Sequence, residues 1–217
     1  MLDPLLLQLA DSGFPSGGFA HSLGLEALRA LGHLRGEAAL ALRLRELVWH
    51  VAHGGLPFVN DAHAGDAACV VRSDRAAEAF LSGHVANRAS RAQGQAFLMA
   101  ADAAFGMQAI AGMRAALPYG HGAVAVGAAM AVAGVSAEDA RTLFLFGAVR
   151  GAASAAVRLG VVGPLRAQRL VFALREEIGE AARAARGWSA EDACGVAPMI
   201  DVAQGAHDRL YARLFQS

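Results

Sequence analysis

The chain has 217 residues, 55% of them apolar, and a formal net charge of zero. This length is enough to bury one sizeable core, and the lack of net positive charge gives no reason to expect nucleic acid as a partner. All 19 basic residues are arginine, which excludes a phosphate-loop lysine, a Schiff-base lysine and a lysine general base.

The first part of the chain predicts two short helices around a dense turn. Asp3-Pro4 is a favourable N-cap and first-turn pair for a leucine-rich helix that stops at the turn of residues 13–18. A second helix is expected over 21–31, with Gly32 just past its end. Phe14 and Phe19 flank the turn, and we expect both rings to be buried against the body of the protein.

Apolar residues at helical spacing predict an amphipathic helix over 37–51. We expect Gly54-Gly55 to end it and Pro57 to start another helix over 58–71. Ser73-Asp74 then provides an N-cap signal for the following helix, and Gly83 marks its end.

The middle of the chain predicts three further helices, over 87–105, 107–117 and 122–133. Gly94 lies inside the first at a cost of roughly 1 kcal/mol relative to alanine, so we expect close helix contact there. The run over 122–133 is nearly free of polar residues. It is shorter than the ~20 residues needed to cross a membrane, so we expect a core helix and no membrane association.

Ser136 caps a long helix to about residue 159, Pro164 begins one that reaches about residue 186, and a terminal helix is expected over 198–214. No segment alternates with period two as a half-buried strand does. We therefore predict an all-α fold, a single compact helical domain of about ten helices over residues 1–217. Residues 186–197 are a candidate hinge that would let the tail, about 198–217, move.

Residues 9–26 read LADSGFPSGGFAHSLGLE. This order of rare residue types at fixed spacing resembles the N-terminal signature of UreF-type urease accessory proteins. Ala89-Ser90 with Gln93-Gly94, Gly120-His121, and residues 197–201 resemble later blocks of the family. Residues 163–166 depart from the family pattern, which leaves the geometry of that loop open.

The resemblance implies a non-enzymatic subunit of a nickel-insertion chaperone complex in urease maturation. Such a protein bridges the urease GTPase UreG and the scaffold UreD/UreH and modulates GTP-dependent nickel delivery to the urease apoprotein. The family also implies a homodimer and a similar all-α fold. The two cysteines, Cys69 and Cys194, are far apart in sequence and favour neither a zinc knuckle nor a disulfide framework. With no export signal at the N-terminus, we expect a cytoplasmic protein.

The histidines are the candidate chemical groups. His50 and His53 are three residues apart on one predicted helix, with His63 further along, and such spacing can place imidazoles on one metal. No cysteine or carboxylate stands close by in sequence to complete a site, so ordinary surface histidines are the favoured interpretation. We predict no metal site, no cofactor and no catalytic residue. The alternative is an uncharacterised all-α enzyme that uses these histidines.

Two regions are candidates for partner binding. Glu26 is either a first-turn carboxylate stabilised by the helix dipole or a partner contact, and His21 is expected to bond the turn backbone. At the C-terminus, a helix would place aromatic, apolar and arginine side chains together, as interface anchors often are. Packing of the tail on its own body is the alternative. The predicted partner-binding residues are Glu26, His207, Leu210, Tyr211, Arg213, Leu214 and Phe215.

Overall fold

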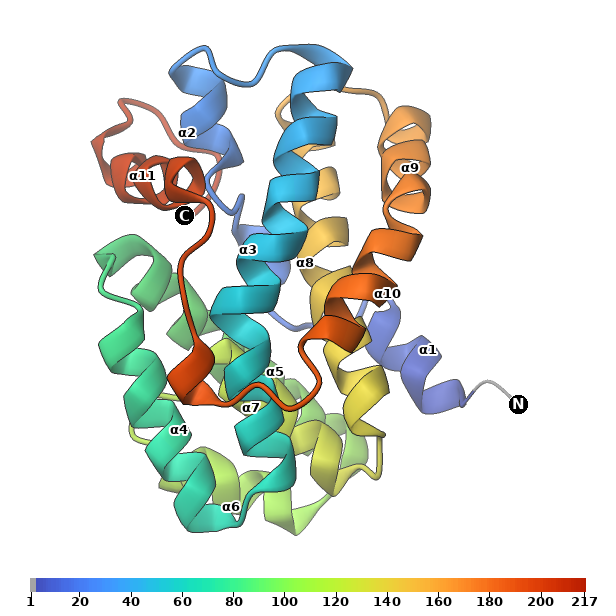
Figure 1. Cartoon of the computed structure of the whole chain (residues 1–217), viewed down its shortest axis with the longest axis vertical. Coiled ribbons are helices and arrows are strands. Elements are labelled where there is room, and N and C mark those ends of the chain that lie inside the picture. The colour runs from blue at the N-terminus through green and yellow to red at the C-terminus, as the bar shows by residue number, and fades with distance from the viewer. Residues whose placement is uncertain (1–2) are drawn as a thin grey trace.

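The longest helix, α3 (Gly36–Ala64), runs through the middle of the molecule, and the other helices are arranged around it (Figure 1). The computed structural model describes residues 3–217. Within that range the fold is all-α and forms one compact domain without a strand, which confirms the predicted fold class. No helix in this range combines the length and apolar character that a membrane crossing requires.

The remaining α-helices are α1 (Pro4–Ala10), α2 (Leu25–Ala30), α4 (Ala67–Phe80), α5 (His84–Phe105), α6 (Gln108–Ala116), α7 (Gly122–Val132), α8 (Ala137–Arg158), α9 (Pro164–Ala173), α10 (Arg175–Ala184) and α11 (Pro198–Ala206). Three short 3₁₀ helices are η1 (Gly18–Ala20), η2 (Ala190–Asp192) and η3 (His207–Arg209).

The predicted break at Gly54-Gly55 and Pro57 is wrong, because α3 continues through all three residues. The glycines instead give aromatic rings room to approach: a Cβ on Gly55 would lie 2.7 Å from the ring of Phe144. Proline lacks an N–H and leaves the carbonyl four residues earlier without its helical donor. The backbone N–H of Cys194 supplies that donor, 3.2 Å from the carbonyl oxygen of His53.

The predicted cap at Ser73-Asp74 is also wrong. Both residues are buried inside α4, which begins at Ala67, with the side chain of Asp66 capping the N–H of Cys69. The carboxylate of Asp74 caps another part of the chain. It accepts the backbone N–H groups of Tyr119, Gly120 and His121 at 2.8–3.1 Å. Asp74 therefore does not cap its own helix. It caps the turn before α7, which is distant in sequence.

Helix α7 and the turn before it lie almost backbone to backbone against α3 and α5. A Cβ on Gly94 would lie 2.0 Å from the carbonyl oxygen of Gly120, and one on Gly127 would lie 2.4 Å from that of Val59. The close contact predicted at Gly94 is confirmed. The predicted core helix over 122–133 is also confirmed as α7, which packs between α3 and α5.

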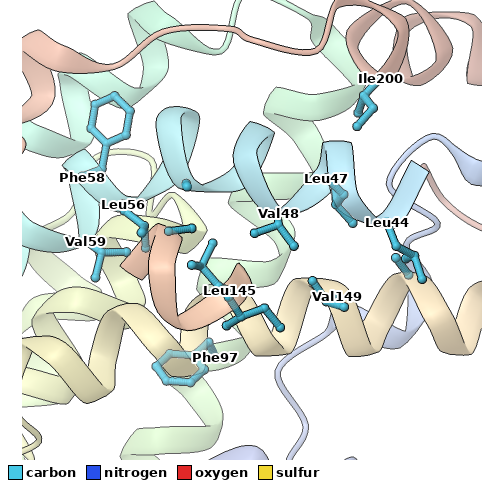
Figure 2. Packing of buried hydrophobic residues seen from close by; sticks show 14 of the residues in the cluster. Leu44, Leu47, Val48, Leu56, Phe58, Val59, Phe97, Leu145, Val149 and Ile200 are labelled. Atoms are coloured by element: carbon cyan, nitrogen blue, oxygen red, sulfur yellow. The ribbon is translucent and has the colours of Figure 1, made fainter. Parts of the chain in front are cut away.

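The centre of the core lies between α3 and α8. Leu44 and Val48 of α3 face Val149 of α8, and Leu145 lies below the middle of α3 (Figure 2). These four side chains are fully buried. Burying a leucine or valine contributes roughly 1.5–3 kcal/mol, so this layer holds the two central helices together.

Three further helix predictions need correction. The helix expected over 164–186 is interrupted at Leu174 and forms α9 and α10. The terminal helix expected over 198–214 ends at Ala206, passes through η3 and continues as non-helical chain from residue 210. The helix expected over 21–31 begins only at Leu25. In each case the sequence signal identified a helix but not its true bounds.

Candidate functional site

The turn after α1 lies on α5. Gly17 has a φ of 75°, which favours glycine, and a Cβ at this position would be 3.0 Å from the Cβ of Ala96. Phe14 is half-buried and packs against Phe97 and Phe105, with ring centroids 5.7 and 6.1 Å away. This aromatic contact fixes the turn on the helix below it.

Phe19 is 71% exposed, so its predicted burial is wrong. Its ring covers the guanidinium of Arg158 at 3.8 Å, and the ring of Phe215 lies 4.2 Å from the same guanidinium. Arg158 also donates a hydrogen bond to the carbonyl oxygen of Phe19. A cation between two aromatic rings explains why Phe19 can remain at the surface, and it links the turn to the C-terminal tail.

Glu26 lies in the first turn of α2, as predicted, but its carboxylate faces the tail. It accepts the backbone N–H of Leu214 at 2.5 Å and of Phe215 at 3.1 Å, and Nε2 of His207 donates to it at 2.9 Å. Only 7% of Glu26 is exposed, and His207 is fully buried. One buried carboxylate thus satisfies three donors of the tail, as a buried charge requires.

His21 and Ser22 hold the end of the tail. Nδ1 of His21 is 2.6 Å from the hydroxyl of Ser217, while the backbone N–H and the hydroxyl of Ser22 both donate to a main-chain oxygen of Ser217. The N–H of Gln216 donates to the carbonyl oxygen of Ala20. We call Ala20, His21, Ser22 and Glu26 the tail clamp. His21 was predicted to bond the turn backbone, but it bonds the tail.

Burial lowers the pKa of His21 to about 4, and the nearby charges of Arg88 and His207 act in the same direction. His21 is therefore neutral near pH 7. In that state one ring nitrogen can accept the hydroxyl proton of Ser217.

The predicted partner-binding residues of the tail divide into two groups. His207 and Phe215 are buried against the body, and Leu210 is half-buried. Tyr211 is fully exposed and Leu214 is 55% exposed. Because the chain is not helical after Arg209, the predicted shared stripe does not form. The clamp holds the tail backbone and turns Tyr211, Arg213 and Leu214 outward.

Arg213 belongs to a charged group around Asp208. The carboxylate of Asp208 lies 3.2 Å from Arg213, 2.8 Å from Arg88 and 3.2 Å from His84. Hydrogen bonding to Arg88 is the main cause that lowers the pKa of Asp208. This group joins the tail to α5, so the tail is attached at both the clamp and the helix.

A cavity of about 730 Å³ lies beneath the turn. Its walls are mostly apolar, and they include polar side chains from the turn, α3, α8 and the end of the tail, among them His21, His50, Arg150 and Ser217. The guanidinium of Arg150 donates to the carbonyl oxygen of Ala10, so this charge is used to hold the end of α1.

Comparison with known proteins decides the family. The UreF family model matches residues 34–175. The urease accessory protein F of rice (Oryza sativa subsp. indica) is 32% identical over 215 residues, covering 96% of this chain and 82% of the rice protein. This chain belongs to the UreF family. Its members are accessory proteins rather than enzymes, which confirms the prediction that the protein is not an enzyme.

Two other relatives extend the comparison. Urease accessory protein F of Arabidopsis thaliana is 32% identical over 223 residues, covering 97% of this chain and 90% of the plant protein. UreF of Trichodesmium erythraeum (strain IMS101) is 30% identical over 222 residues, covering 97% and 94%. The turn, the clamp and the tail lie outside the family-model match, but the relatives align over almost the whole chain.

The UreF-family fold keeps the candidate histidines apart. Nε2 of His50 lies 3.6 Å from Asp201, Nδ1 of His53 lies near the thiol of Cys194, and Nε2 of His63 donates to the Val135 carbonyl oxygen. Among residues 3–217, no three histidine, cysteine or acidic side chains are placed to share a metal.

The sequence did not identify one buried network. Nε2 of His121 is 2.9 Å from Glu78, and its Nδ1 is 3.1 Å from the hydroxyl of Ser90. That hydroxyl also accepts the N–H of Gly122 at 3.2 Å. Burial lowers the pKa of His121, and the bond to Glu78 opposes this shift. The network ties the start of α7 to α4 and α5. The resemblance had marked Ser90 and His121 without giving them a role.

Proposed function

We propose that this UreF-family chain is a subunit of the nickel-insertion chaperone complex of urease maturation. It bridges the GTPase UreG and the scaffold UreD/UreH and modulates GTP-dependent delivery of nickel to the urease apoprotein. Membership of the family and the relatives named urease accessory proteins support this proposal. The chain contains no lysine, so the phosphate-binding lysine for GTP hydrolysis belongs to the partner.

The outward-facing side chains of the tail support the proposal that UreD/UreH binds there. Tyr211 and Leu214 are large side chains left in solvent on backbone that the clamp holds in place. Exposed aromatic and arginine side chains on an ordered backbone are typical anchors of an interface. We propose that Tyr211, Arg213 and Leu214 contact UreD/UreH. Glu26, His207, Leu210 and Phe215 act with them by holding the tail.

We propose a homodimer in the cytoplasm. Two large apolar side chains of α9, Leu165 and Phe172, are 85% and 66% exposed, and apolar residues exposed in this way favour association. Both cysteines are free thiols, which is compatible with a reducing compartment. Light scattering on the purified chain distinguishes a dimer from a monomer.

The test is capture of UreD/UreH by the tagged full-length chain. The double variant Tyr211→Ala and Leu214→Ala should lose capture and keep the parent melting temperature, because both side chains face solvent. Met99→Ala is the control, since it removes a large side chain of α5 that is 57% exposed and belongs to neither proposed interface. The proposed contact is wrong if the double variant captures UreD/UreH as well as the parent, or if Met99→Ala loses capture equally.

Point variants test this contact better than deletion of the tail. Removing everything after Asp201 would delete the buried residues Ala203, His207 and Phe215. Each large side chain lost from the core costs roughly 1.5–3 kcal/mol, so a deleted chain that fails to bind could simply be destabilised.

A further inference from the structure

Hydrogen bonds attach the segment between α10 and α11 to α3, beside the carbonyl that Pro57 leaves without a helical donor. The backbone N–H of Cys194 donates to the carbonyl oxygen of His53 at 3.2 Å. The N–H of Ala190 donates to the carboxylate of Asp61, and the side chain of Asn60 donates to the carbonyl oxygens of Ala185 and Trp188. These bonds hold Cys194 in a fixed position beside one turn of α3.

The same contacts place an imidazole beside the thiol. Nδ1 of His53 lies 3.6 Å from Sγ of Cys194. The imidazole stacks on Trp188 with ring centroids 4.6 Å apart, and the ring of Trp49 lies 6.2 Å away. Aromatic stacking restricts rotation of the histidine ring, so its nitrogen remains directed at the sulfur. Cys194 itself is exposed, which gives a reagent access to the pair.

Cys69 provides an internal comparison. It is half-buried, and its thiol donates to the Asp61 carbonyl oxygen at 3.7 Å. An acceptor of this kind holds a thiol proton and cannot remove it. The two cysteines of the chain therefore differ in both access and the presence of a base.

We propose that Cys194 is a thiol-modification site that exchanges with low-molecular-weight disulfides, with His53 as its base. Nδ1 of His53 takes the Sγ proton, and the thiolate attacks one sulfur of the disulfide. The new S–S bond forms as the old one breaks, leaving one half of the reagent on Cys194. The departing thiolate takes the proton back from the imidazolium, so the step needs no other oxidant.

Acidic side chains surround the pair of Cys194 and His53. On α3, His50 pairs with Asp201 of α11 at 3.6 Å. The carboxylate of Asp192 in η2 bonds the N–H and hydroxyl of Ser189, and Glu191 is exposed beside it. These acidic groups disfavour an anionic reagent by repulsion, so the expected substrates are small neutral or cationic disulfides.

The test uses dithiodipyridine, a neutral disulfide whose leaving group is followed by absorbance. Full-length Cys69→Ser and Cys194→Ser chains isolate each thiol, and rates are measured from pH 5 to 8. Cys194 should react at least about fivefold faster than Cys69 at pH 6, where an unassisted thiol is almost entirely protonated. His53→Phe keeps a ring against Trp188 and removes the nitrogen, so it should abolish this advantage.

The pH profile separates a base from a packing residue. An unassisted thiol slows about tenfold per pH unit below its pKa, whereas His53 should flatten the profile of Cys194 between pH 6 and 8, and His53→Phe should restore the steep slope. The rate at Cys69 in a His53→Phe, Cys194→Ser chain checks that the fold is intact. The proposal is overturned if His53→Phe leaves the rate and slope of Cys194 unchanged, or if Cys194 reacts no faster than Cys69.

Discussion

Replacing Glu26 by alanine should release the C-terminal tail. The change removes the acceptor of three donors, two of them backbone N–H groups at 2.5 and 3.1 Å and the third Nε2 of buried His207. A hydrogen bond to a charged group contributes roughly 1.5–3 kcal/mol, and a buried donor left without a partner costs a similar amount. Detachment of the tail lets water satisfy the donors but exposes Phe215, at a further cost of roughly 1.5–3 kcal/mol.

The three bonds and the burial of Phe215 are lost together, so their energies do not add. We expect a decrease of about 3–5 kcal/mol in the free energy of unfolding. For a chain of this size, 1 kcal/mol shifts the melting temperature by about 2–4 °C. Calorimetry should therefore give a melting temperature lower by roughly 6–20 °C.

Amide hydrogen exchange locates the effect. The amides of Leu214, Phe215 and Gln216 should lose protection in Glu26→Ala, whereas amides in the middle of α3 should keep theirs. Glu26→Gln keeps the shape and one acceptor oxygen, so it should lie between parent and alanine variant. Glu176→Ala, at a carboxylate that is 83% exposed, should change little. Unchanged protection of Leu214 and Phe215 in Glu26→Ala would refute the clamp.

Three other predictions concern pH and internal packing. Burial keeps His21 neutral in the folded chain, with a pKa of about 4. As pH falls from about 6.5 to 4, the unfolded chain therefore binds a proton at this histidine that the folded chain does not bind. The melting temperature should fall over this range, and it should fall less steeply in His21→Asn. Gly94→Ala should destabilise the protein by about 3–5 kcal/mol in urea unfolding, because its Cβ meets backbone at 2.0 Å. Gly112→Ala, at an open position of α6, should be neutral or stabilise by up to about 1 kcal/mol. Asp74→Asn should cost about 2–4 kcal/mol in the same assay, since its amide N–H₂ would face backbone donors; equal stability to the parent would contradict the assigned capping role.

Sequence patterns predicted the helices well where local signals and tertiary contacts agree. Ser136 caps α8, Gly94 lies at a close helix contact, and Gly83 separates α4 from α5, all as expected. The UreF signature also led to the correct family. The cap and the break depend on residues near one another in sequence. A glycine inside a helix costs stability, so its presence at Gly94 indicates that a neighbouring backbone needs the space.

The errors occur where a distant segment changes the meaning of a local signal. Pro57 does not break α3, because Cys194 bonds the carbonyl that the proline leaves free. Asp74 caps a turn more than forty residues away. The tail was predicted as helix from its spacing, but Glu26 and Ser22 hold its last residues by their backbone in a non-helical conformation. The spacing of residues along one sequence does not reveal which distant residues pair in the fold.

The tail clamp also bears on the order in which the chain can fold. Its hydrogen bonds join residues separated by 181–196 positions, so the residues of the clamp are synthesised long before the tail that they bind. At ~5–20 residues per second, the ribosome needs roughly 10–40 s to cover that distance. During this interval Glu26, His21 and the backbone around them have no tail to bind, while α3 and the helices around it can already assemble. Because contacts of such long range are slow to form, we expect docking of the tail to be the step that completes the fold.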